Sequence, residues 1–128
     1  IFVGGGVAHG PKGGGNYKIR KLNKKERSIS LISILSKKNK DKHLYVIEDF
    51  KNQIKKTKDF NNLLKKFKFT NPLFVLDDMS KKNINLCSRN IKGIKSTTCE
   101  HLNSYDLIKY KQTVFTISSI KKIEERFK

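Results

Sequence analysis

The stretch HLYVIEDFKNQIKKTKDFNNLLKKFKFTNPLFVLDD, residues 43–78, decides the fold class of this 128-residue chain. Its apolar runs at 43–47 and 73–76 are short and continuous, which is typical of strands buried on both faces of a sheet. Between them, Thr57 begins a predicted helix whose apolar residues recur at helical spacing: Phe60, Leu63, Leu64 and Phe67. Because a strand, a helix and a strand in succession form a parallel crossover unit, the stretch predicts an α/β fold.

The same alternation continues on both sides of this stretch. Asn23 is a suitable N-cap for a helix running to about Asn39, in which Ser28, Leu31, Ile32 and Leu35 lie at helical spacing. The elements expected after residue 78 are a short helix capped by Ser80 and running through Leu86 to Arg89, a strand at 94–98, a helix opening at Asn103-Ser104-Tyr105-Asp106, a strand at 113–115, and a closing helix from Ser118 to Phe127. We therefore predict a three-layer α/β/α domain over residues 23–128, with a mostly parallel four-stranded sheet.

Residues 1–22 differ from this domain in composition, and we predict that they form an extended, glycine-rich basic arm. Seven of the chain's eight glycines lie between Gly4 and Gly15. Glycine has no Cβ, so the backbone at Gly4 to Gly6 and at 13–15 can approach another surface closely. The first acidic residue of the chain is Glu26, so the side chains of the arm carry only positive charge.

The balance of charge indicates the kind of partner. The chain has 29 Lys and Arg residues against 11 Asp and Glu residues, a formal net charge of +18. Such a surplus opposes the compact state unless a polyanion neutralises it, and nucleic acid is the polyanion that the composition favours. No segment approaches the ~18 apolar residues that a membrane span requires, so we expect no membrane partner. The Lys runs at 37–42, 55–58, 65–68 and 121–122 are interpreted mainly as solvated helix faces.

The glycine-rich start does not match a nucleotide-binding loop. A P-loop needs a Lys followed by Ser or Thr after its second glycine, and here Pro11 separates Gly10 from Lys12 with no hydroxyl after it. In the dinucleotide pattern, His9 stands where the third glycine would be. We expect neither a small-molecule substrate nor a cofactor.

Two acidic pairs, Glu48-Asp49 and Asp77-Asp78, follow predicted strands. Open α/β sheets place their sites at such strand ends, so these carboxylates could hold Mg²⁺ in a phosphotransferase or nuclease. The competing interpretation is that they cap turns and helix starts. We predict no enzyme, because no nucleophile, base or phosphate loop accompanies the pairs, and we keep the magnesium-dependent enzyme as an alternative.

Cys87, Cys99 and His101 are the remaining potential ligand cluster. Zinc sites usually have closely spaced Cys pairs and four ligands, whereas these two Cys are twelve residues apart. We predict a buried structural Cys pair and no metal. Two Cys in a chain of this length do not form a disulfide framework, which favours a reducing compartment.

Several pieces of the sequence, in order along the chain, resemble the L-four family of large-subunit ribosomal proteins. They are Gly4 to Lys12 (GGGVAHGPK), Lys24 to Ser36 (KKERSISLISILS), Leu44 to Phe50, Thr57 to Phe60, Leu73 to Asp78, Ser88 to Ile94 (SRNIKGI), Leu102 to Leu107 (LNSYDL) and Ile123 to Arg126. The chain departs from the family at 13–15, where glycines replace a proline- and arginine-bearing sequence, and at Glu26, where an apolar residue is usual.

The resemblance implies an α/β fold and a structural role in the ribosome, with large-subunit RNA and neighbouring ribosomal proteins as partners. It also implies that the family's N-terminal part, with a loop to the peptide exit tunnel, would precede Ile1. With the AT-biased composition, it favours a mitochondrial ribosome over plastid or bacterial ones. The second alternative is a free-standing RNA-binding regulator. The residues expected to contact RNA are Gly4, Gly5, Gly6, His9, Lys12, Lys18, Arg20, Lys21, Lys24, Lys25, Arg27 and Arg89.

Overall fold

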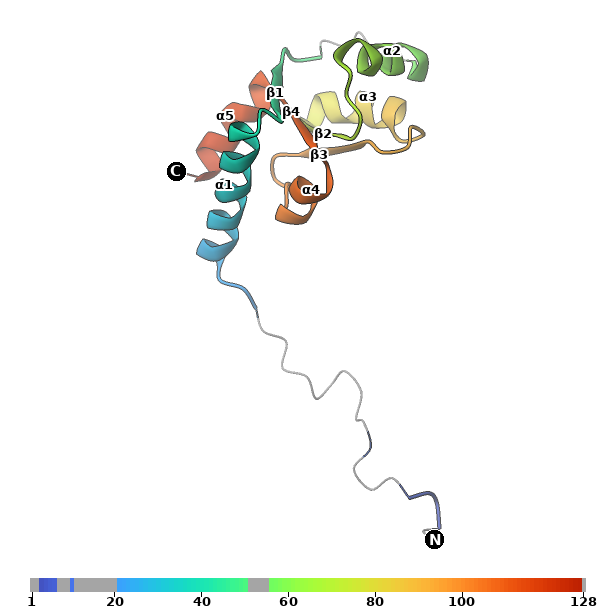
Figure 1. Ribbon diagram of the computed structural model, residues 1–128, viewed down its shortest axis with the longest axis vertical. Coiled ribbons are helices and arrows are strands. Elements are labelled where there is room, and N and C mark those ends of the chain that lie inside the picture. Colours follow the sequence, from blue (N-terminus) through green and yellow to red (C-terminus); the bar gives the residue numbers. More distant parts are fainter. Residues whose placement is uncertain (1–2, 7–9, 11–20, 51–55, 128) are drawn as a thin grey trace.

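A computed structural model describes residues 3–6, 10, 21–50 and 56–127 of the chain (Figure 1). Within these ranges, four strands form one parallel sheet in the order β1-β4-β2-β3. The strands are β1 (Leu44–Ile47), β2 (Pro72–Leu76), β3 (Lys95–Thr98) and β4 (Gln112–Thr116). The predicted α/β class is confirmed, and the described sheet is parallel throughout.

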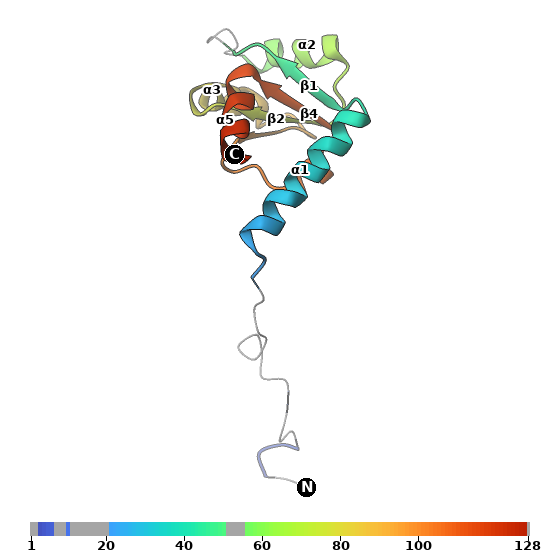
Figure 2. The same cartoon turned by 90° about the vertical axis from the view of Figure 1, so that its left-hand side faces the viewer.

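Helices cover both faces of the sheet, as predicted. One face packs against α1 (Lys24–Lys40), α4 (Ser104–Lys109) and α5 (Ile117–Phe127), and Figure 2 shows α1 and α5 on the same side of β1 and β4. The opposite face packs against α2 (Thr57–Phe67) and α3 (Asp78–Ser88). Alternate residues of β2 serve the two faces, since Leu73 and Val75 belong to one core cluster and Phe74 and Leu76 to the other.

Local sequence explains where several helices begin and end. The side chain of Asn103 accepts a hydrogen bond from the backbone N–H of Asp106 at 2.7 Å, so it caps α4 as its position predicted. Lys68 has a left-handed backbone (φ 53°) and ends α2. The predicted start of α3 at Ser80 was wrong, because the helix begins at Asp78, directly after β2.

Two expectations about burial were also wrong. The first strand is not buried on both faces: β1 is an edge strand in this sheet, and Tyr45 and Val46 are 36% and 53% exposed. In α1, the core residue is Leu31, with Ile34 and Leu35 packed beside it, whereas Ile32 points away and is 45% exposed. The sequence pattern placed the apolar side of this helix slightly off its true position.

Lys38 also differs from its prediction, because it belongs to a run of lysines that was interpreted as a solvated helix face. Its side chain is only 8% exposed and joins α1 to the segment that precedes β4. The ammonium group donates hydrogen bonds to the carbonyl oxygens of Tyr110 (2.5 Å) and Lys111 (3.2 Å) and to Oγ1 of Thr113 (2.8 Å). Burial lowers the pKa of Lys38 to about 8. This lysine therefore supports the fold and is not available to a partner.

Candidate nucleic-acid interface

Most of the positive charge on the described part of the chain has no acidic partner. Two ion pairs join its acidic and basic side chains, Lys95 with Asp106 (2.7 Å) and Lys122 with Asp77. The Asp106 carboxylate is buried, so Lys95 compensates a charge that would otherwise be costly there. The large remaining surplus of cations is consistent with a polyanionic partner.

The start of α1 concentrates four of the predicted RNA-contacting residues. Lys21, Lys24, Lys25 and Arg27 are all exposed, and the last three lie in the first turn of the helix. The first turn is the positive end of the helix dipole, where cations are unfavourable and anions are favoured. Three cations at this position make sense when an external anion such as phosphate neutralises both them and the helix end.

Glu26 lies among these cations, in the first turn of α1. Its carboxylate accepts a hydrogen bond from the backbone N–H of Asn23 at 3.3 Å. An acidic residue in the first helical turn satisfies an N–H group that has no partner inside the helix. Glu26 therefore stabilises the beginning of α1, and the neighbouring basic side chains remain exposed.

Part of the predicted arm can be compared with the structure. Gly4 and Gly5 have φ values of +95° and +104°, which side-chain-bearing residues rarely adopt, and a Cβ built on Gly4, Gly5 or Gly6 would have no neighbour within 4 Å. Close packing within the described part of the chain therefore does not explain why these three positions are glycine. The other predicted contact residues of the arm, His9, Lys12, Lys18 and Arg20, lie outside the described residues.

Arg89, the last predicted contact residue, does not join the group at the start of α1. It is exposed at the C-terminal end of α3, which packs on the opposite face of the sheet from α1. Of the five predicted basic residues that the structure describes, it thus brings four together at the start of α1 and places Arg89 elsewhere. Any RNA contact by Arg89 belongs to a second surface.

The carboxylate pairs at the strand ends hold α5 against the sheet. Asp49 accepts hydrogen bonds from the backbone N–H and the hydroxyl of Ser118, at 3.3 and 2.5 Å, and so caps the beginning of that helix. Asp77 pairs with Lys122 one turn further along α5, and this hydrogen bond lowers the pKa of Asp77. The capping interpretation is confirmed for Asp49, whereas the Asp77 side chain makes no cap hydrogen bond on α3 and pairs with Lys122 instead.

The magnesium alternative has no support in the described residues. Among them, no group of three or more His, Cys, Asp and Glu side chains is arranged to hold a metal ion. The oxygens of Asp49 and Asp77 already have partners on α5. Nor does any helix in the described ranges have the length and apolar character to cross a membrane.

The two cysteines are both buried, but they lie on opposite faces of the sheet. Cys87 belongs to the core cluster under α2 and α3, and Cys99 to the cluster on the other face of the sheet. The Cys99 thiol donates a hydrogen bond to the carbonyl oxygen of Ser119 at 3.1 Å, and burial raises the pKa of this thiol. His101 is exposed. The prediction of buried cysteines is confirmed, and the prediction that they lie together was wrong.

Comparison with known proteins supplies the family. The protein-family model described as "Ribosomal protein L4/L1 family" matches residues 1–126 of the chain. The chain belongs to this family. It is 51% identical over 127 residues to the large ribosomal subunit protein uL4 of Pelagibacter ubique, covering 99% of this chain and 61% of the relative. It is 38% identical over 125 residues to uL4 of Geobacter sulfurreducens, covering 96% of this chain and 58% of that protein. It is 36% identical over 124 residues to uL4 of Thermoanaerobacter sp. X514, covering 97% and 59%.

This member of the ribosomal L4/L1 family therefore spans about 60% of the length of these three bacterial relatives. The resemblance drawn from its sequence is confirmed at the level of the family.

Three further lysines, which are not among the predicted RNA-contacting residues, lie around one pocket. Lys65 and Lys68 come from the end of α2, and Lys92 comes from the loop between α3 and β3. The signal in the sequence was the alternation of lysine with phenylalanine in KKFKFT, residues 65–70. Basic residues interleaved with aromatic ones are typical of surfaces that bind single-stranded nucleic acid.

Proposed function

We propose that the chain is a structural constituent of the large ribosomal subunit that binds ribosomal RNA and supports subunit assembly and translation. The match of residues 1–126 to a ribosomal protein family carries this proposal. The exposed cations at the start of α1 supply a physical reason for it, because phosphate would relieve their repulsion with the helix dipole.

The proposed mode of binding is contact with phosphates of folded RNA. Lys21, Lys24, Lys25 and Arg27 supply charge at the start of α1, and the arm before them supplies further charge and close backbone approach at Gly4 to Gly6. Phosphate contacts position a protein without reading sequence, so the specificity comes from the shape of the RNA. The chain acts without catalysis, metal or cofactor, and neighbouring large-subunit proteins are its other partners.

Co-sedimentation with large ribosomal subunits tests this function. The chain is expressed with an affinity tag in cells that contain its cognate ribosomes, and lysates are fractionated on gradients at high magnesium concentration. We expect the tagged chain in the large-subunit fractions, and we expect it to remain there after a moderate salt wash. A chain that stays at the top of the gradient while still binding RNA would instead support a free-standing regulator.

We also infer the compartment from composition. The chain has 25 Lys but only 4 Arg, with 14 Ile and 11 Asn, which indicates an AT-biased genome and supports a mitochondrial ribosome. The three relatives named above are bacterial, so a bacterial ribosome is the direct alternative, and a plastid ribosome is the third. Immunolocalisation in the source cells distinguishes the three: signal outside mitochondria would contradict the mitochondrial assignment.

A further inference from the structure

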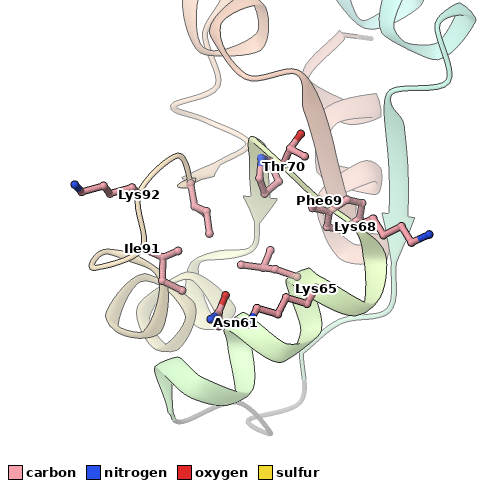
Figure 3. Close-up of a pocket in the computed structure, with 10 residues that line it drawn as sticks. Asn61, Lys65, Lys68, Phe69, Thr70, Ile91 and Lys92 are labelled. Carbon is pink, nitrogen blue, oxygen red and sulfur yellow. The ribbon is translucent and has the colours of Figure 1, made fainter.

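A pocket of about 310 Å³ opens at the edge of the sheet where β2 and β3 begin, between the end of α2 and the loop that leads into β3 (Figure 3). This volume lies at the lower end of the range for small-ligand sites, ~300–1,000 Å³. The pocket is on the face of the sheet opposite α1, so it is separate from the cations at the start of that helix.

The interior of the pocket is apolar and its rim is basic. Leu64 and Pro72 are buried beneath it, and Ile91 forms part of one wall. Three of its ten lining residues are lysines and none of these ten is acidic. Figure 3 shows Lys68 and Lys92 on opposite sides of the pocket, with their ammonium groups directed outward and away from each other. Negative charge is therefore favoured on both sides of whatever group enters the pocket.

Aromatic rings continue from the pocket to the surface. Phe69 lines the pocket, and the ring of Phe67 stacks on it with centroids 5.5 Å apart and planes at 15°. Phe67 is 55% exposed, so its ring is accessible to a further planar group. Tyr45 meets Phe69 edge-on at 5.0 Å and holds that ring in place. A stacked pair with an accessible ring is a platform on which nucleic-acid bases pack.

The shape of the pocket depends on a glycine in the loop that forms its wall. Gly93 has φ +82°, a left-handed conformation in which any residue with a Cβ is strained. This conformation turns the chain between Lys92 and Ile94, both of which line the pocket. Asn61 lies at the mouth near Ile91, and its amide offers both a donor and an acceptor for the edge of a base.

We propose that this pocket receives an unpaired base of an RNA strand, with Lys68 and Lys92 contacting the phosphates on either side and Phe67 stacking on a neighbouring base. Sequence-independent recognition of single-stranded RNA combines these three features, an apolar or aromatic seat for a base, a stacking ring and flanking cations. An acidic protein segment would satisfy the lysines, but it would not use the stacked rings. The inference rests on the proposed function, because it assumes that RNA is the partner.

The test uses the whole chain and two probes, a short oligouridylate and an RNA duplex of the same length. Methyl NMR spectra are recorded with each probe, and we expect the oligouridylate to shift the methyl signals of Leu64, Ile91 and Ile94 more than the duplex does. Unchanged signals from these three residues at saturating oligouridylate would overturn the proposal. Shifts produced by polyglutamate but not by oligouridylate would overturn it in favour of an acidic protein partner.

Three variants separate the contributions of charge and shape. Lys68→Gln with Lys92→Gln is expected to lower oligouridylate affinity about tenfold and to reduce the salt-dependence slope by about 1.4, at ~0.7 per phosphate of a single strand. The conservative pair Lys68→Arg with Lys92→Arg should keep the slope. Asn61→Leu should weaken binding without changing the slope, since it alters the mouth of the pocket and no charge.

The matched control is Lys82→Gln with Lys121→Gln, which removes the same charge from exposed positions on α3 and α5 that do not line the pocket. An equal loss of affinity in this control would refute a specific role for the pocket. Co-sedimentation with large subunits is measured in parallel for every variant. If the chain still enters large subunits while the pocket gives no NMR response, the pocket assignment fails and the proposed function stands.

Discussion

Neutralising the cations in the first turn of α1 should change folding stability and RNA affinity in opposite directions. The variant is Lys24→Gln, Lys25→Gln and Arg27→Gln, which keeps Glu26 and its hydrogen bond to Asn23. All three cations are exposed and lie at the positive end of the helix dipole. Each such charge costs about 0.3 kcal/mol or more at low ionic strength, so their removal should stabilise the free chain by about 1 kcal/mol.

The same substitutions remove three of the proposed phosphate contacts. At ~0.7–0.9 per phosphate, the slope of log affinity against log salt for ribosomal RNA should fall by about 2 to 3. Thermal unfolding without RNA measures the first effect, and a gain of about 1 kcal/mol corresponds to a rise of about 4 °C in the melting temperature for a domain of this size. Fluorescence anisotropy with large-subunit RNA over a range of salt concentrations measures the second.

The control is Lys37→Gln with Lys40→Gln, at the other end of the same helix. Cations are favourable at the C-terminal end of a helix, so this control should lower the melting temperature slightly. The reasoning is refuted if the first-turn variant is less stable than the parent chain, or if its salt slope for RNA is unchanged.

Other consequences of the structure are open to direct measurement. In Lys38→Met, loss of the hydrogen bonds to two carbonyl oxygens should destabilise the chain at neutral pH by about 1–3 kcal/mol. The pKa of Lys38 is lowered from 10.5 to about 8 in the folded state, so between these pH values the unfolded chain binds more protons than the folded chain. The free energy of unfolding of the parent should therefore rise by up to about 3 kcal/mol, relative to that of Lys38→Met, as the pH increases through this window. Urea unfolding at several pH values measures this difference. Asp49→Ala should cost about 0.5–2 kcal/mol through loss of the cap on α5, and added Mg²⁺ should not restore the melting temperature. Gly93→Ala should cost about 1–2 kcal/mol, because φ +82° is strained for alanine even though its Cβ would meet only ordinary contacts; a melting temperature equal to the parent's would contradict the strain.

The order of helices and strands could be predicted because it depends on local patterns. Short apolar runs at 43–47 and 73–76 and helical spacing around Phe60 and Leu64 are properties of neighbouring residues, and the structure has strands and a helix there. The cap at Asn103 is equally local, since its partner is three residues away. Such features need no knowledge of the tertiary fold.

The errors concern features that only the tertiary arrangement determines. The exposure of Val46 follows from the position of β1 at the edge of the sheet, and the order β1-β4-β2-β3 is not encoded in the apolar pattern of β1 itself. Burial of Lys38 depends on carbonyl oxygens 72 and 73 residues further along the chain. Cys87 and Cys99 are twelve residues apart in sequence, but the sheet lies between their core clusters.

In the candidate site, too, some features could be predicted from local sequence and others depend on the tertiary fold. Exposure of the cations at the start of α1 could be predicted from the sequence, because a run of like charges beside a helix cap is seldom buried. The pocket between α2 and the loop before β3 could not be predicted from the sequence. Lys68 and Lys92 lie on either side of it only because β2 and β3 pair in parallel. Arg89 is separated from α1 because α3 packs on the opposite face of the sheet.

The strand order also affects how this protein acquires its structure during synthesis. In the described sheet, β1 hydrogen-bonds to β4 alone, so the first of these four strands to be synthesised pairs with the last. Pairing over such a long sequence separation is slow, because the intervening loop must close before any contact compensates its entropy. Until residue 116 has emerged, β1 lacks its partner in the described sheet, and the two apolar clusters lack Phe115 and Val114, which β4 supplies. We therefore expect this sheet to be completed late in synthesis, and its apolar surfaces to be open to aggregation until β4 is in place.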